Sequence, residues 1–302
     1  MYITKRGRIY LAVIFSMVCW SFSFVWVKVV YVSYKPITTV LFRLIISSVL
    51  LFAFGIICKK LDKPDRKGFL NLMLLAFFEP FLYFMGESFG MQYVSSTLGS
   101  VIVSTIPLFT PITAWYLYRE KLSIRNFIGL LVSFLGVGIV VLNKDFSLQI
   151  STAGFMLMFL AVLSAIGYSA VLKKASYQYN PLTVIAYQNF IGIFYFLPFW
   201  LIFDVNDFMH TPFNGNAMWA IFKLAVFASS LAFILYTYAI RHLGINKANI
   251  FTNTIPVFTA IFAFFILEEE LNLRKLIGIS VVIGGLFLSQ LKSNQETIEQ
   301  IA

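Results

Sequence analysis

Few residues in this chain carry charge, and this scarcity decides the class of protein. Only 12% of the 302 residues are Asp, Glu, Lys or Arg, whereas 60% are hydrophobic and 18% are aromatic. Water-soluble domains carry about 25% charged residues, and about half of their residues are apolar. A water-soluble globule could not bury this much apolar surface, so the sequence predicts a protein that lies in a lipid bilayer.

Cysteine and histidine are also scarce, which argues against a disulfide framework or a metal site. Cys19 and Cys58 lie within apolar segments and form no CxxC motif, so we interpret both as packing residues. His210 and His242 lie near predicted helix ends. We therefore expect neither a metal ion nor a cofactor.

Acidic residues are outnumbered by basic ones, and the formal net charge is +10. This balance could suggest a nucleic-acid-binding protein, but most Lys and Arg lie in short gaps between apolar runs, without a basic stripe or a recognition motif. The expected partners are a small-molecule solute and the lipid bilayer, with no nucleic acid. The oligomeric state stays open.

The N-terminus has basic residues before an apolar run, as a signal peptide does. The run continues to about Val30 without a small-residue cleavage site, so we interpret it as a first transmembrane helix.

The apolar runs predict an all-α integral membrane protein with ten transmembrane helices. A helix needs roughly 20 mostly apolar residues to cross a bilayer. The predicted spans are residues 9–28, 36–58, 68–91, 97–118, 124–142, 152–173, 181–203, 217–241, 247–268 and 272–291.

Basic residues predict the orientation of these spans. One set of alternate connections and tails holds 16 Lys and Arg, and the other set holds 5. Positive charge concentrates on the cytoplasmic side of membrane proteins. Both termini are therefore expected in the cytoplasm, in a multi-pass protein of the inner (cytoplasmic) membrane.

The two halves of the sequence resemble each other. Between residues 105–136 (TIPLFTPITAWYLYREKLSIRNFIGLLVSFLG) and 254–285 (TIPVFTAIFAFFILEEELNLRKLIGISVVIGG), 14 of 32 positions are identical at an offset of 149. The halves are residues 1–147 and 148–292, followed by a polar tail at 293–302. Five helices is an odd number, so the second half is expected to be inverted relative to the first, as in many secondary transporters.

A family resemblance follows from these residues. Three segments carry it, namely WSFSFVWVK (20–28), GMQYVSSTLGSVIVSTIPLFTPITAWYLYREKLSIRNFIGLLVSFLGVGIVVL (90–142) and AIRHLGINKANIFTNTIPVFTAIFAFFILEEELNLRKLIGISVVIGGLFL (239–288). In these segments the chain is similar to EamA-type members of the drug/metabolite transporter superfamily. The resemblance implies that helices 1–4 and 6–9 surround a central cavity, with helices 5 and 10 peripheral. It also implies transport of small organic solutes, often outward, and says little about which solute.

Two acids interrupt the apolar stretch FFEPFLYFMGESFG at 77–90. On a continuous helix, Glu79, Tyr83 and Glu87 would share one face. A charge near the bilayer centre costs at least ~2.5–3.5 kcal/mol on insertion scales, so these acids need water or a partner. Either Arg43 pairs permanently with one of them, or Glu79 lines a transport path and binds a cationic group or a proton.

Other intramembrane polar residues have both a functional and a packing interpretation. Arg43 either orients an anionic group of a solute or locks two helices together. The remaining candidates for lining the cavity are Trp20, Ser23, Thr105, Gln188, Asn189, Tyr236 and Asn253. Ordinary aromatic packing or hydrogen bonding between helices would explain the same residues.

Prolines and glycines inside the predicted helices complete the pattern. Pro80, Pro107 and Pro256 are expected to kink their helices, and paired interruptions point to a transporter's central site. The glycines at 129, 136, 138, 278, 284 and 285 are expected to serve close helix packing. Glu120 and Glu269 recur at connections, where we expect them to stabilise the loops.

The sequence therefore favours a secondary transporter that is not an enzyme. We expect it to export a small metabolite or drug-like solute by alternating access, and proton coupling through Glu79 is a hypothesis. A channel-like or exchanger-type carrier is the alternative, with a membrane-embedded enzyme less favoured. Substrate, direction and coupling ion are not encoded in recognisable motifs.

Overall fold

The chain folds into helices throughout the residues that the computed structural model describes, which are 5–109, 124–141, 151–244, 248–249 and 251–290. In chain order the helices are α1 (Lys5–Tyr31), α2 (Pro36–Ile57), α3 (Arg66–Ala76), η1 (Phe77–Leu82), α4 (Tyr83–Gly90), α5 (Ser96–Val103), α7 (Ile124–Val141), α8 (Thr152–Gln178), α9 (Pro181–Phe203), α10 (Val205–His210), α11 (Gly215–Lys223), η2 (Leu224–Ala232), α12 (Phe233–Leu243), η3 (Phe251–Thr254), α14 (Ile255–Leu267) and α15 (Leu273–Gln290).

Six of the helical stretches are long and apolar enough to cross a membrane. They are Arg6–Tyr31, Pro36–Ile57, Arg66–Gly90, Thr152–Gln178, Pro181–Phe203 and Gly215–Leu243. Shorter apolar helices occupy Ser96–Phe109, Phe127–Val140 and Phe251–Leu267. The prediction of an all-helical membrane protein is confirmed, whereas the count of ten spans stays a prediction.

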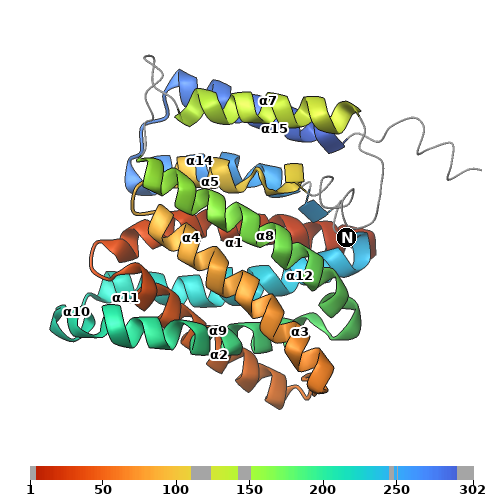
Figure 1. Ribbon diagram of the computed structural model, residues 1–302, viewed down its shortest axis with the longest axis vertical. Coiled ribbons are helices and arrows are strands. Elements are labelled where there is room, and N and C mark those ends of the chain that lie inside the picture. The colour runs from red at the N-terminus through yellow and green to blue at the C-terminus, as the bar shows by residue number, and fades with distance from the viewer. Residues whose placement is uncertain (1–4, 110–123, 142–150, 245–247, 250, 291–302) are drawn as a thin grey trace, which may run out of the picture.

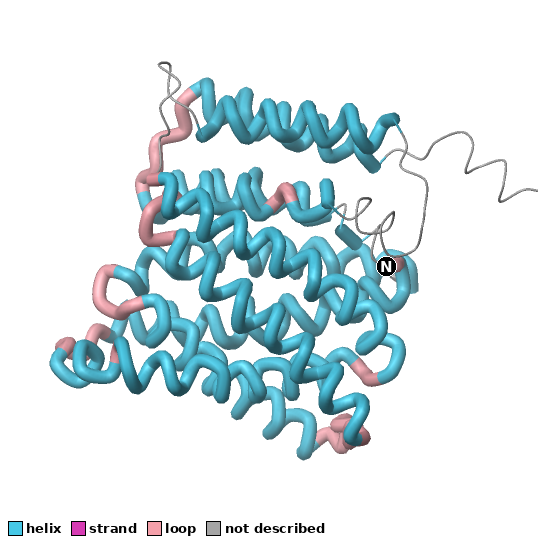
Figure 2. The backbone as a smooth tube through the Cα atoms, viewed as in Figure 1, coloured by secondary structure: helices cyan, strands magenta, loops and turns pink. Residues whose placement is uncertain are grey.

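The helices form layers that can be followed in the ribbon (Figure 1). The helices α7 and α15 lie side by side and form the uppermost layer. Below them α5 packs on α14, and α1, α4, α8 and α12 form the centre. At the opposite edge α2 packs along α9. The tube representation shows that helices run across the whole molecule and that loops gather at its two ends (Figure 2).

The first helix of each half packs against the other half. The helix α1 contacts η2, α12 and α14, whereas α8 contacts η1, α4 and α5. These two sets of partners are the third and fourth predicted spans of the opposite half. The halves are therefore interleaved, and the interior lies between them.

Two of the long stretches change from α-helix to π-helix near their middle. The segment η1 has Glu79 in an extended conformation, with φ −144° and ψ 122°. Adding the repeat offset of 149 to Phe77–Leu82 gives residues 226–231, which lie inside η2. π-Helical turns inside α-helices are rare and occur frequently at functional sites.

The two TIP motifs also interrupt their helices. The helix α5 ends at Val103, and the amide of Thr105 donates to Ile102 O over three residues at 3.1 Å. In the second half the 3₁₀ turn η3 precedes α14, and Pro256 lies in the first turn of α14. The expectation that Pro256 kinks the interior of a continuous helix is therefore wrong. Proline is tolerated in a first turn because the amide there has no helical partner.

Close backbone contact explains several of the predicted packing glycines. A Cβ at Gly136 would lie 2.6 Å from Val282 N, and one at Gly285 would lie 2.5 Å from Ser133 N. A Cβ at Gly284 would meet no atom within 4 Å, so this glycine is not needed for close packing. The packing interpretation also holds for Cys19, which is buried, but is wrong for Cys58, which is exposed at the end of α2.

Candidate functional site

Three charged side chains are enclosed between the two halves. Arg43 on α2 is 2% exposed, Glu79 in η1 is 5% exposed, and Glu87 on α4 is 6% exposed. The surrounding buried polar side chains are Ser47, Gln188, Asn189, Ser229, Ser230, Tyr83, Tyr168 and Tyr236. These residues come from α2, η1, α4, α8, α9, η2 and α12, so most central helices contribute to one interior polar region.

Arg43 is held by neighbours from both halves. Its Nε donates to Ser229 Oγ at 2.8 Å, and its guanidinium carbon lies 4.3 Å from the centroid of the Phe84 ring. Ser229 belongs to η2 and Phe84 to α4. A guanidinium stacks well on an aromatic face while its other N–H groups stay available. Arg43 is thus oriented without being neutralised by these contacts.

A hydroxyl and amide network lies beside Arg43. Asn189 Nδ2 donates to Ser47 Oγ at 2.7 Å and to Ser229 O at 2.8 Å. The hydroxyls of Ser47 and Ser230 are 2.6 Å apart, and Ser230 Oγ donates to Ala225 O five residues back at 2.7 Å. The π-helical turn leaves carbonyls that side chains can satisfy inside the membrane. The network therefore connects α2, α9 and η2 at the point where η2 departs from the α-helix.

Glu79 and Glu87 are not paired with Arg43. Over the part of the chain that the structure describes, the ion pair found joins Lys35 to Asp207, and neither buried glutamate has a hydrogen-bond partner for its carboxylate. The alternative of a permanent ion pair is therefore not what this conformation contains. The continuous helix on which the shared face was predicted is interrupted at Glu79, whose backbone is extended.

Aromatic side chains line one part of this interior polar region. Trp20 packs edge-on against Phe233 and Tyr236, with ring centroids 5.0 Å and 4.9 Å away. Tyr168 donates its hydroxyl to Gln188 Oε1 at 3.2 Å. Tyr236 donates to Asn249 Oδ1. Trp20 is thus in contact with Tyr236, and Gln188 is bonded to Tyr168, while a role of these residues in binding a solute stays a prediction.

Asn253 differs from the other candidates because its side chain is buried and unsatisfied. It is 1% exposed, and neither side-chain amide atom has a partner within the described residues. Ser48 and Thr237 carry similarly unsatisfied hydroxyls. By contrast, Ser23 donates to Trp20 O and Thr105 donates to Ile102 O, both at 2.7 Å, so these two hydroxyls bond locally to their own helices.

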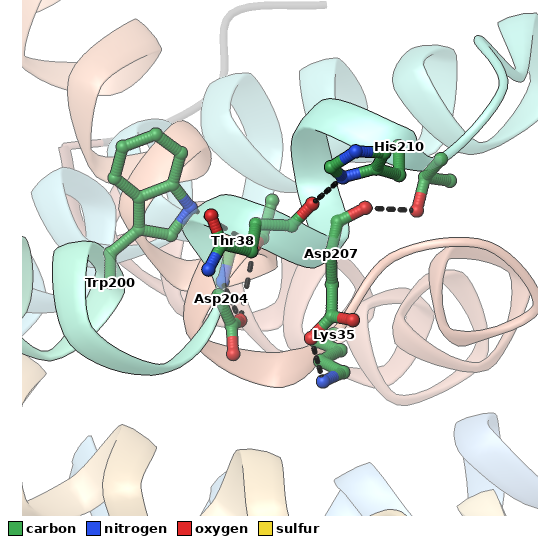
Figure 3. A network of polar contacts seen from close by, with 8 residues as sticks. Lys35, Thr38, Trp200, Asp204, Asp207 and His210 are labelled. Atoms are coloured by element: carbon green, nitrogen blue, oxygen red, sulfur yellow. Dashed lines mark hydrogen bonds and ion pairs between the residues drawn. The ribbon is translucent and has the colours of Figure 1, made fainter.

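Sequence reasoning missed the serines of η2 and the carboxylate of Asp204, which closes a helix start. Asp204 is 4% exposed and accepts from Thr38 N and Thr38 Oγ1 at 2.9 and 3.0 Å, at the start of α2. Trp200 donates to the same hydroxyl at 3.1 Å, and Lys35 pairs with Asp207 beside it (Figure 3). This exposed contact raises the pKa of Lys35 through a hydrogen bond to Asp207.

Glu269 closes a second helix end, which confirms the expected role in stabilising a connection. Its carboxylate accepts from Ser96 N at 2.6 Å, Thr97 N at 3.2 Å and Thr97 Oγ1 at 2.8 Å, at the start of α5. Its repeat counterpart Glu120 lies outside the described residues. Among the described residues no group of three or more His, Cys, Asp or Glu could hold a metal ion.

Comparison with known proteins gives a family match across nearly the whole chain. The model of the EamA-like transporter family matches residues 7–142 and 152–291. An uncharacterized transporter of Archaeoglobus fulgidus is 25% identical over 96% of this chain and 100% of its own length. The uncharacterized transporter YetK of Bacillus subtilis is 28% identical over 83% of this chain and 77% of its own length.

Two further similarities agree with this match. A WAT1-related chloroplastic protein of Arabidopsis thaliana is 27% identical over 89% of this chain and 66% of its own length. A protein of known crystal structure shares the fold, with a TM-score of 0.70 over 97% of this chain and 99% of that chain. At 12% identity, that likeness concerns the fold alone.

Proposed function

Because the chain belongs to the EamA-like transporter family, we propose that it is a secondary transporter for a small organic solute. In this proposal it works by alternating access in the cytoplasmic membrane and moves the solute outward. The similar proteins named as transporters support the general class. The interior polar region supports the assignment of a site.

We further propose ten spans arranged as two inverted five-helix repeats. The interleaved packing of α1 and α8, and the π-helical turns at equivalent positions, support an internal two-fold relation. A Cβ at Gly136 would lie 3.0 Å from Gly278 O, and a Cβ at the equivalent Gly285 would lie 2.8 Å from Gly129 O. Such reciprocal contacts are what a two-fold axis generates. With five spans per half and the observed bias in basic residues, both termini would be cytoplasmic.

One observation carries the proposal, namely that Arg43, Glu79 and Glu87 are buried between the halves without pairing with one another. Burying a charge without a partner is expensive, and a purely structural core would gain stability by pairing or replacing these residues. Their retention is explained if a solute or a proton occupies the region during part of the cycle. Arg43 would then attract an anionic group, and Glu79 would take a cationic group or a proton.

The helix interruptions support a site that opens alternately to the two sides. Glu79 has an extended backbone within η1, and Ser229 lies in the equivalent π-helical segment η2. Bends at these points allow the two ends of a helix to move separately. A change in how the halves pack would then open the site to one side or the other, while Arg43 and Glu79 stay near the centre.

Transport in reconstituted vesicles tests this proposal. The purified protein would be supplied with a mixture of cell metabolites, and accumulation would be read by mass spectrometry at several pH gradients. We expect saturable uptake of a small set of solutes, and loss of at least tenfold in rate for Glu79→Gln. The matched control is Glu270→Gln at an exposed connection, which should transport like the wild type.

The same assay distinguishes the alternatives. Uptake that never saturates with solute would favour a channel over a carrier. Uptake that needs a second solute on the opposite side would indicate an exchanger. Equal flux for Glu79→Gln and the wild type at every pH would remove Glu79 from the transport path.

A further inference from the structure

A basic pocket lies away from the central site, at one end of the molecule. Its volume is about 390 Å³, and it is lined by Lys67, Asn71, Lys174, Tyr177 and Gln178. Lys67 and Asn71 lie in the first turns of the stretch Arg66–Gly90, and the other three residues lie in the last turns of Thr152–Gln178. Both stretches are long enough to cross the membrane, so the pocket lies where two such helices reach the membrane surface.

The walls of the pocket are tied together. The helices α3 and α8 are in contact (Figure 1), and the Tyr179 hydroxyl donates to Asp65 Oδ1 at 3.0 Å. Asp65 also accepts from Gly68 N at 3.0 Å. A Cβ at Gly68 would lie 1.8 Å from the Tyr179 oxygen, so only glycine allows this approach. The pocket between α3 and α8 therefore has a defined width.

The lysines of this pocket have no partner within bonding distance among the described residues, although the pKa of Asp65 is lowered by the Tyr179 hydroxyl and, to a lesser extent, by the charge of Lys67. Neither ammonium group forms an ion pair or a hydrogen bond with the residues that the structure describes. The nearby carboxylate of Asp65 is already used by Tyr179 and by the start of α3. Because Lys67 comes from the first half and Lys174 from the second, one anion between them would be contacted by both halves.

An apolar surface leads from the pocket toward the middle of the membrane. Along α3 and into η1, Leu70, Leu74 and Phe77 recur at helical spacing and are 57%, 47% and 39% exposed. Exposed apolar side chains at membrane depth face acyl chains. A charged pocket at the end of such a surface matches the two parts of a phospholipid, and basic pockets between transmembrane helices bind anionic lipid headgroups.

We propose that this pocket binds the phosphate-containing headgroup of an anionic phospholipid, with Lys67 and Lys174 contacting the phosphate. Asn71, Tyr177 and Gln178 donate hydrogen bonds to headgroup oxygens, and the acyl chains lie along α3. The bound lipid connects α3 to α8. This proposal concerns a different surface from the transport site and stands whether or not Glu79 transports a solute.

Native mass spectrometry of the full-length protein, with added phosphatidylglycerol or phosphatidylcholine, tests the proposal. The wild type should retain phosphatidylglycerol preferentially. Each single change, Lys67→Gln or Lys174→Gln, should weaken phosphatidylglycerol binding about 5-fold, and the double change about 30-fold. Phosphatidylcholine binding should not change, and a double change to arginine should preserve the preference.

The control is the double change Lys60→Gln and Lys63→Gln, which removes the same charge from exposed lysines outside the pocket. It should bind phosphatidylglycerol like the wild type. An equal loss in this control, or no loss in the pocket variant, would overturn the proposal. Displacement of the lipid by glycerol 3-phosphate at about the same concentration would also overturn it, because the ligand would then be a soluble anion.

Discussion

At the scale of single residues, the ionisable side chains occupy two kinds of environment. Arg43, Glu79 and Glu87 are enclosed without pairing with one another, whereas Asp65 and Asp204 accept hydrogen bonds at helix starts. A carboxylate at a helix start accepts amide hydrogens that no backbone carbonyl can accept. The second group therefore serves stability, and the first is the group that the proposed transport function would use.

Asp65 offers a test of this distinction through pH. The Tyr179 hydroxyl, followed by the amide of Gly68, holds the pKa of Asp65 below its ordinary range. A lowered pKa means that the ionised form stabilises the folded state above the ordinary pKa, and that this contribution is lost as pH falls through the folded pKa. We expect Asp65→Ala to lower the melting temperature at pH 7, and the difference from the wild type to shrink below about pH 4.

Thermal unfolding in detergent at a series of pH values measures this difference. The control is Glu270→Ala, an exposed acid whose carboxylate has no hydrogen bond within the described residues. A difference between wild type and Asp65→Ala that stayed constant from pH 7 down to acid would contradict the argument.

At the scale of helices, three helix starts receive a carboxylate from elsewhere in the chain. Asp204, which follows α9, closes the start of α2, and Asp62, which follows α2, accepts from Asn180 at the start of α9. Glu269, which follows α14, closes the start of α5. These contacts keep the exposed amides of helix starts satisfied where the helices leave the membrane.

Asp204 and Asp207 form a matched pair of variants within the network of Figure 3. Asp204→Ala removes a buried acceptor of two hydrogen bonds from Thr38, so we expect a loss of about 1–3 kcal/mol in unfolding free energy. Asp207→Ala removes an exposed ion pair with Lys35, and we expect a smaller loss because water screens this pair. Equal effects in denaturant unfolding would show that burial does not decide the contribution.

Gly284 and Gly285 form a second matched pair, on α15. Gly285→Ala would place a Cβ 2.5 Å from the backbone of α7, which cannot yield locally, so we expect a loss of about 1–3 kcal/mol. Gly284→Ala meets no atom within 4 Å and should be neutral or stabilising by up to about 1 kcal/mol through helix propensity. Thermal unfolding of both variants measures the contrast, and destabilisation by Gly284→Ala would refute it.

At the scale of the whole molecule, the proposed topology predicts which connections lie on each side of the bilayer. Ten spans in inverted halves would place Val32, Met209 and Glu270 on one side of the membrane, and Lys60, Lys174 and His242 on the other. All six positions are exposed. In a background without Cys19 and Cys58, single cysteines at these positions should react with an impermeant thiol reagent from opposite sides. Labelling of both sets from one side would exclude the proposed topology.

Much of this protein could be predicted from the sequence because membrane insertion depends on composition. Apolar runs of sufficient length must be helical in lipid, so the helices follow from the order of residues alone. The family resemblance was confirmed by the match over residues 7–142 and 152–291. The positions of Arg43, Glu79 and Glu87 inside apolar runs could be read from the sequence, whereas their burial was seen only in the structure.

Only the tertiary structure decided which polar groups meet. The bond from Arg43 to Ser229 joins residues 186 positions apart, and the bond from Thr38 to Asp204 joins residues 166 apart. The extended backbone at Glu79 agrees with the local preference of a residue that precedes proline, whereas the π-helical turn that holds Ser229 contains no proline. The sequence by itself determined that these helices lie in lipid, because solvation acts on each segment separately. Which polar side chains meet depended on long-range packing, because those contacts require all of the helices to be in place.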